Sequence, residues 1–123
     1  MGRQNIKSLS MGERELLKLV SEMSNGIWRA NNKLKSSYHD KDNNDIRLSI
    51  KHLESVITIL EKAGFEIKDH NGELFDIGMA LNVLTFQPMP DIEKDTIIET
   101  IKPTIYYNDA IIQRGQVIVA KPE

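Results

Sequence analysis

The chain has 123 residues, a formal net charge of -2 and 28% charged residues, so it has no extended basic field of the kind that holds nucleic acid by its phosphates. It has no Cys, which excludes disulfide frameworks, thiol catalysis and Cys-based metal sites and is compatible with a reducing cytosol. No stretch approaches the roughly 20 apolar residues that span a bilayer, so we expect a cytoplasmic protein with no membrane segment.

The N-terminal segment lacks the apolar core of a signal peptide, and residues 1–10 are expected to form a flexible N-terminus. Ser10 followed by Glu13 has the spacing of a capping box, in which the hydroxyl and the carboxylate satisfy backbone N–H groups of the first turn. This spacing predicts a helix that starts near Met11 and opens a helical region over residues 11–63.

Apolar residues in this region recur at spacings of four and three, which places them along one side of a helix. In the first predicted helix they are Leu16, Val20, Met23, Ile27, Ala30 and Leu34. The polar segment Ser36–Asn44 is expected to be a connector whose end caps the second helix. In that helix the same spacing recurs in Ile46, Ile50, Leu53, Ile57 and Leu60, beside a second apolar line of Leu48, Val56, Ile59 and Ala63.

Helices of this length gain most of their stability from packing, and two helical hairpins from two chains would bury both apolar seams. The pattern therefore predicts a homodimer. Its interface is expected to contain Leu16, Val20, Met23, Ile27, Leu34, Ile50, Leu53 and Ile57. The alternative is an intrachain helical hairpin that lies on the β domain.

The hydrophobic rhythm changes at Gly64, a residue suited to the left-handed conformation that closes a helix. Strands are predicted at Phe65–Lys68, Met79–Phe86, Thr96–Lys102 and Gln116–Lys121. A tight Asn-Gly turn is predicted within Asp69–Glu73, and exposed loops are predicted at Gln87–Asp91 and Tyr107–Asp109. The predicted fold class is α+β: an N-terminal helical hairpin or coiled-coil dimerisation region, followed by a small antiparallel β domain over residues 64–123.

No set of residues predicts catalysis or a bound cofactor. The three histidines, His39, His52 and His70, have no metal-ligand spacing and are expected on the surface. Asp40, Asp42 and Asn44 resemble the start of a calcium-binding loop. The twelfth position of that loop is Lys51 rather than the required Glu, which favours a helix-capping loop. The carboxylates Glu66, Asp69, Glu73 and Asp76 flank the first predicted hairpin, where solubility is their expected role. Trp28 is expected to make a core or rim contact beside the seam.

The order of several short motifs resembles the GrpE family of nucleotide exchange factors for DnaK-type chaperones. The resemblance runs from about Leu16 to Lys121. It is carried by Asp45-Ile-x-Leu-x-x-Lys51, Gly64-Phe-Glu-Ile67, Phe75-Asp76, Thr96-Ile-Ile-Glu99 and Gln116-Val-Ile-Val-Ala-Lys121. The resemblance implies a non-enzymatic homodimer whose β domain binds the ATPase domain of a DnaK-type chaperone, with no cofactor. Candidate contact residues implied in the same way are Phe75, Ile101, Asn108, Ala110, Gln113 and Arg114.

The sequence departs from the family pattern at several positions. The usual Gly-Tyr before the last hairpin is Thr104-Ile105 here, the usual Arg-Pro-Ala near its end is Gln113-Arg114-Gly115, and an Arg common after the hairpin Gly is Ala110. These departures lead us to expect a divergent, short relative or a piece of a longer protein. They also support an alternative function, a dimeric scaffold that has kept the fold and lost chaperone binding. A small hydrolase using a carboxylate such as Asp76 is a third and weaker hypothesis.

Overall fold

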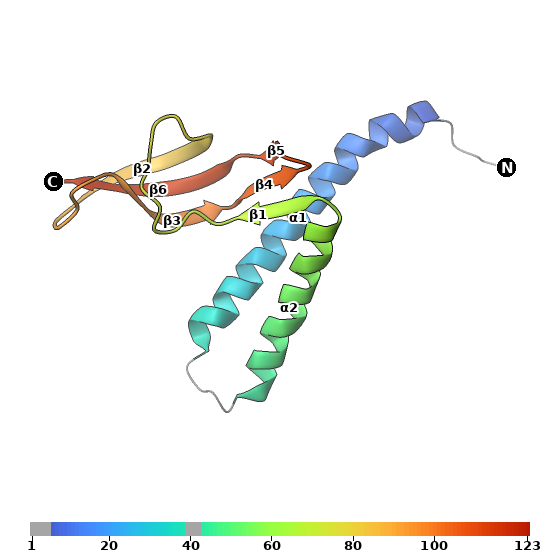
Figure 1. Cartoon of the computed structure of the whole chain (residues 1–123), viewed down its shortest axis with the longest axis horizontal. Coiled ribbons are helices and arrows are strands. Elements are labelled where there is room, and N and C mark those ends of the chain that lie inside the picture. The colour runs from blue at the N-terminus through green and yellow to red at the C-terminus, as the bar shows by residue number, and fades with distance from the viewer. Residues whose placement is uncertain (1–5, 39–42) are drawn as a thin grey trace.

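The computed structural model describes residues 6–38 and 43–123, which form a pair of helices followed by a β head (Figure 1). The helices are α1 (Ile6–Ser37) and α2 (Asn44–Lys62). The strands are β1 (Phe65–Lys68), β2 (Leu81–Met89), β3 (Thr96–Lys102), β4 (Thr104–Tyr107), β5 (Ala110–Gln113) and β6 (Gly115–Pro122). The predicted α+β class, with helices first and an antiparallel-rich head second, is confirmed.

Helix α1 has 32 residues and begins at Ile6, so the predicted start near Met11 is wrong. Ser10 lies within the helix instead of at its N-cap, because the helix begins about one turn before the Ser10–Glu13 capping-box spacing. Of the expected flexible segment, residues 6–10 are helical and residues 1–5 lie outside the described part of the chain.

Helix α2 has the caps that its sequence predicts. The side chain of Asn43 accepts a hydrogen bond from the backbone N–H of Ile46 at 3.2 Å, which satisfies a donor in the first turn. At the other end Gly64 takes a φ of 99°, the left-handed conformation expected after a helix. The first connector residues, Ser36 and Ser37, still belong to α1, and residues 39–42 lie outside the described ranges.

The apolar lines of the helices differ in burial. Residues of one line are half-buried: Val20, Ile27 and Leu34 of α1, with Ile46, Ile50, Leu53, Ile57 and Leu60 of α2. The main contacts of α2 are with α1 and β1, so these residues pack between the helices and against the joint with the head. Leu16, Met23 and Ala30 of α1 are exposed, as are Leu48, Val56, Ile59 and Ala63 of α2. Within one chain, the helices therefore form a hairpin that leaves apolar side chains uncovered.

The head consists of two three-stranded sheets, in the orders β1-β4-β5 and β2-β6-β3. Figure 1 shows β1, β4 and β5 close to the helices and the other sheet extending away from them. The pairs are antiparallel except for β2 with β6, which is parallel, so the expectation of a wholly antiparallel domain is corrected there. The expected first hairpin is also absent from the described residues, because β1 pairs with β4, with Phe65 opposite Tyr107 and Lys68 opposite Thr104.

Strand β2 runs from Leu81 to Met89, two residues later at its start than predicted and three residues longer at its end. The predicted loop Gln87–Asp91 is therefore wrong over residues 87–89. Pro88 is compatible with a strand here because β2 lies at the edge of its sheet and pairs on one side only.

Strand β3 matches its predicted bounds, and the predicted strand Gln116–Lys121 lies within β6. Strands β4 and β5 were not predicted as strands, and Tyr107 belongs to β4 instead of the loop expected there. Asn108 and Asp109 form the tight turn between β4 and β5, with φ values of 48° and 68°. The core of the head is made by Leu81, Ile97, Val117 and Val119, and Phe75, Met79 and Val83 pack against it.

Candidate partner-binding surface

Helix α1 is attached to the head by a pair of amide side chains. Asn25 Nδ2 donates to Gln113 Oε1 at 3.0 Å, and Gln113 Nε2 donates to Asn25 Oδ1 at 2.7 Å and to the Pro103 carbonyl at 2.9 Å. Asn25 is 6% exposed, so water barely reaches its side chain. The two amides satisfy each other's hydrogen bonds instead. The pair fixes the middle of α1 to the end of β5.

A second attachment lies one turn farther along α1, at the carboxylate of Asp69. Trp28 Nε1 donates to Asp69 Oδ2 at 3.1 Å, and Asn32 Nδ2 reaches the same oxygen at 3.4 Å. The other oxygen accepts from the backbone N–H of Asn71 at 2.8 Å and from the hydroxyl of Thr100 at 3.4 Å. One side chain therefore joins α1, the turn after β1 and strand β3.

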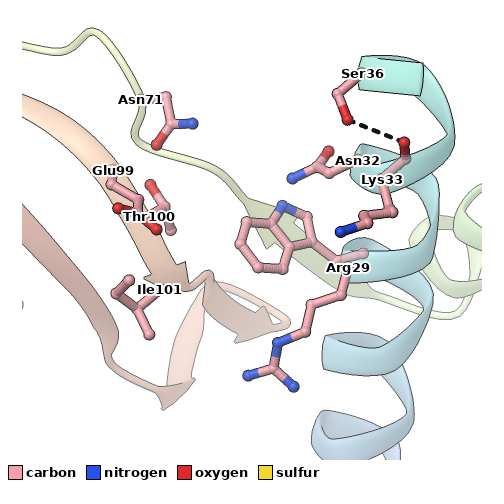
Figure 2. Close-up of a pocket in the computed structure, with 9 residues that line it drawn as sticks. Arg29, Asn32, Lys33, Ser36, Asn71, Glu99, Thr100 and Ile101 are labelled. Carbon is pink, nitrogen blue, oxygen red and sulfur yellow. Dashed lines mark hydrogen bonds between the residues drawn. The ribbon is translucent and has the colours of Figure 1, made fainter. Parts of the chain in front are cut away.

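An open groove of about 560 Å³ follows this attachment between α1 and the head. Figure 2 shows Arg29, Asn32, Lys33 and Ser36 on the helix side, facing Asn71, Glu99, Thr100 and Ile101 on the head side. Ile101, a predicted chaperone contact, is half-buried in this groove. The groove combines an aromatic wall, from Trp28, with cationic and amide groups, which is a composition suited to protein contacts.

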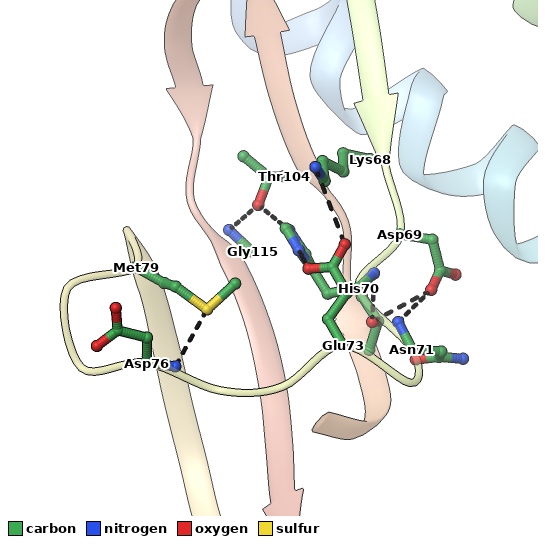
Figure 3. A network of polar contacts seen from close by, with 10 residues as sticks. Lys68, Asp69, His70, Asn71, Glu73, Asp76, Met79, Thr104 and Gly115 are labelled. Atoms are coloured by element: carbon green, nitrogen blue, oxygen red, sulfur yellow. Dashed lines mark hydrogen bonds and ion pairs between the residues drawn. The ribbon is translucent and has the colours of Figure 1, made fainter. Parts of the chain in front are cut away.

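His70 is buried, with 4% exposure, so the prediction of a surface histidine is wrong for this residue. Its Nδ1 lies 3.0 Å from Glu73 Oε1 and its Nε2 lies 2.7 Å from the Thr104 hydroxyl (Figure 3). Because a carboxylate only accepts hydrogen bonds, Nδ1 donates to Glu73. The oxygen of the Thr104 hydroxyl accepts from the backbone N–H of Gly115 at 3.2 Å. The network fastens the turn after β1 to the start of β4 and β6. Of the other two histidines, His52 is exposed on α2 and His39 lies outside the described residues.

The four carboxylates around the first turn do not converge on one site. Asp69 faces α1, Glu73 binds His70, and Asp76 Oδ1 accepts from the backbone N–H of Gly78 in its own turn at 3.2 Å. Glu66 is exposed on β1. In the ranges 6–38 and 43–123, no group of three or more His, Asp and Glu side chains is placed to hold a metal ion. The helices of the same ranges include none that is long and apolar enough to cross a membrane.

The turn between β4 and β5 touches the joint between α2 and the head. The backbone N–H of Asn108 donates to the Gly64 carbonyl at 2.9 Å, and a Cβ placed on Gly64 would collide with Asn108 Oδ1. Phe65 packs beside Tyr107, with ring centroids 4.6 Å apart. The tip of the hairpin is therefore held by the residues that close α2.

The six residues expected to contact a chaperone lie in different parts of the head. Asn108 and Ala110 are exposed at the hairpin tip, and Gln113 is engaged by Asn25. Arg114 is exposed but donates to Asn82 Oδ1 at 3.1 Å and to the Leu81 carbonyl at 3.4 Å. Phe75 packs against the core of the head and edge-on against Phe86, with ring centroids 5.9 Å apart. The structure brings together the hairpin residues and leaves Phe75 apart from them.

Sequence reasoning missed the residues that attach α1 to the head: Asn25, Asn32, Asp69 and Thr100. One local signal was available, since Asp69 two residues before Asn71 has the spacing of a side chain that caps a turn. The side chain of Asn25 meets that of Gln113 across 88 positions, and no local pattern encodes that contact.

In comparison with known protein families, the GrpE family model matches residues 7–121 of the chain. Comparison with curated proteins gives no significant match. The matched region covers nearly all of α1, the whole of α2 and nearly the whole head.

Proposed function

Because this chain belongs to the GrpE family, we propose that it binds the ATPase domain of a DnaK-type chaperone and promotes the release of ADP. The family consists of nucleotide exchange factors, which act by binding and carry out no covalent chemistry. The match over residues 7–121 is the observation that carries the proposal. We propose a cytoplasmic homodimer as the working form.

The physical basis of exchange is thermodynamic linkage. A factor that binds the open form of the nucleotide cleft more tightly than the closed form must weaken nucleotide binding by the same free energy. Such a factor needs a rigid surface. A loosely held head would have to become ordered on binding, and the entropic cost of that ordering would reduce the difference in affinity. The attachments of Asn25 to Gln113 and of Trp28 to Asp69 support this requirement, since they hold the head to α1 at two points.

We place the chaperone contact on the head at the hairpin residues Asn108, Ala110 and Gln113 and at Arg114 after the hairpin, with Ile101 and Phe75 at separate points. Self-association is assigned to the apolar residues of the helices: Leu16, Val20, Met23, Ile27, Leu34, Ile50, Leu53 and Ile57. The exposure of Leu16 and Met23, at 60% and 57%, supports this assignment, because both side chains are uncovered in a single chain.

The direct test is stopped-flow release of a fluorescent ADP analogue from the cognate chaperone, with and without saturating protein. We expect release to accelerate at least about tenfold, which corresponds to lowering the activation free energy of release by about 1.4 kcal/mol. Ala110→Glu should reduce the acceleration severalfold, because it places a charge on the exposed hairpin tip. Gln87→Glu adds the same charge to an exposed position of β2 and serves as the matched control.

A dimeric scaffold that has lost chaperone binding is the second candidate. It is favoured by the side chains of Gln113 and Arg114, which stand where the family has Arg-Pro and are engaged within the chain by Asn25, Asn82 and Leu81. Unchanged ADP release at saturating protein, together with no chaperone binding by calorimetry, would favour the scaffold over the exchange factor.

A further inference from the structure

A basic cavity of about 430 Å³ lies on the N-terminal side of the Asn25–Gln113 pair, between α1 and the head. Arg14, Lys18, Ser21 and Asn25 line it from α1, Lys102 from β3 and Gln113 from β5. It is separate from the groove of Figure 2, which follows Trp28 toward the end of α1 and shares none of these residues.

The charge of this cavity is unbalanced. Arg14, Lys18 and Lys102 contribute three cationic groups, and Glu22 is the one carboxylate among its lining residues. In the described part of the chain, none of the three cations forms an ion pair within 4.0 Å. This local excess contrasts with a net charge of -2 for the whole chain. Cations that line a recess and have no ion-pair partner raise the local concentration of anions there.

A buried hydroxyl in the same cavity also lacks a partner. Ser21 is 6% exposed, and its Oγ has no hydrogen-bond partner among the described residues. A buried hydroxyl without a partner is unfavourable unless something else satisfies it. By contrast, the nearby amides of Asn25 and Gln113 are paired with each other, so they form a fixed wall.

From these observations we propose that the basic cavity binds a small ligand through an oxyanion group, a phosphate or a carboxylate. Arg14, Lys18 and Lys102 supply charge-assisted hydrogen bonds to the anion, and the Ser21 hydroxyl, whose oxygen is covered in this structure, donates another once the lining side chains shift to admit the anion. The volume lies within the usual range for small-molecule sites and leaves room for more than one anionic group. The proposal does not depend on chaperone binding, because Arg14, Lys18 and Lys102 are not assigned to the chaperone contact; of the residues assigned to it, Gln113 also lines the cavity.

The test is isothermal titration calorimetry of the full chain with pyrophosphate, inorganic phosphate and citrate, at constant ionic strength. Binding of the first two identifies a phosphate site, and binding of citrate alone identifies a carboxylate site. Lys18→Ala and Lys102→Ala should each weaken binding about tenfold, as expected for loss of a charge-assisted hydrogen bond. Lys62→Ala removes an exposed cation at the end of α2 and should change the affinity by less than about twofold.

Ser21→Ala provides a variant that does not alter charge. It should weaken binding about threefold while leaving the helical circular dichroism and the urea midpoint unchanged, because no protein contact is lost. Absence of binding for all three anions would overturn the proposal. So would an equal loss of affinity in Lys62→Ala, or an unchanged affinity in Ser21→Ala, since either result would indicate diffuse charge attraction without a defined site.

Discussion

At the scale of single residues, Gly64 is the position where backbone conformation and space are both most restrictive. Its φ of 99° lies in the left-handed region, and Asn108 fills the space that a side chain would need. Gly72 has a similar φ of 85° but faces open space. A comparison of substitutions at the two glycines therefore separates the free-energy cost of left-handed backbone conformation from the cost of a steric collision.

We expect Gly64→Ala to lower the free energy of unfolding by about 3 kcal/mol, through left-handed strain and displacement of the hairpin tip. Gly72→Ala should cost about 1 kcal/mol, since strain alone applies there. Urea unfolding followed by circular dichroism measures both values. Equal losses for the two variants would contradict the proposed contact between Gly64 and Asn108.

At the scale of elements, α1 is attached to the head by polar contacts. Asn25 meets Gln113 and Trp28 meets Asp69, on neighbouring turns of one helix face. A buried amide pair of this kind adds little net stability while it is intact, and loss of one partner leaves a desolvated group unsatisfied. The orientation of the head relative to α1 should therefore be sensitive to single substitutions here.

Asn25→Ala and Gln113→Ala should each cost about 2 kcal/mol in the free energy of unfolding, because each leaves the other amide buried without its partner. The double variant should cost at least about 1 kcal/mol less than the sum of the two. Asn32→Ala on the same helix, where the amide is exposed, should cost less than about 0.5 kcal/mol. Additive single costs in urea titrations would argue against direct coupling of the pair.

The elements that sequence reasoning predicted correctly are those with local signals. Asn43 caps α2, Gly64 ends it, and the β-branched run Thr96–Lys102 forms β3 with the predicted bounds. Strands β4 and β5 were not predicted from the local pattern, because their turn uses Asn108-Asp109 without glycine; the family resemblance alone implied a hairpin there. The first helix turn was misplaced because a capping-box spacing can also occur inside a helix.

The candidate site was less predictable than the fold, because its contacts join distant parts of the chain. His70 carried no sign of burial in its own neighbourhood, and its partner Thr104 lies 34 positions away. The same holds for Asn25 and Gln113, whose side chains are polar and suit a surface as well as a buried pair. In both cases the burial depends on a partner that is distant in the sequence, and local residue spacing does not encode such contacts.

At the scale of the whole molecule, the helix hairpin leaves one apolar face uncovered. Leu16, Leu19 and Met23 of α1 are 50–60% exposed, while Ile27 is half-buried. A substitution at an exposed position such as Met23 therefore tests self-association without disturbing the packing inside one chain. A second copy of the chain is the partner that we propose for the exposed residues.

Met23→Asp should therefore shift sedimentation equilibrium toward the monomer and weaken nucleotide exchange, while the helical circular dichroism stays close to that of the parent chain. Ile27→Asp should dissociate the dimer as well, but it should also lower the stability of the hairpin. Thr58→Asp introduces the same charge at an exposed position of α2 and should leave the association unchanged. A Met23→Asp variant that sediments as a dimer would refute the assigned interface.

The position of β6 in its sheet affects how the head is made during translation. This strand lies between β2 and β3, which have no ladder with each other, yet it follows both of them in the sequence. During synthesis, β2 and β3 therefore lack their common partner strand until residues 115–122 leave the ribosome, whereas both helices are complete much earlier. Chaperone-like protection during synthesis would matter most in that interval, since free strand edges are the usual templates for aggregation.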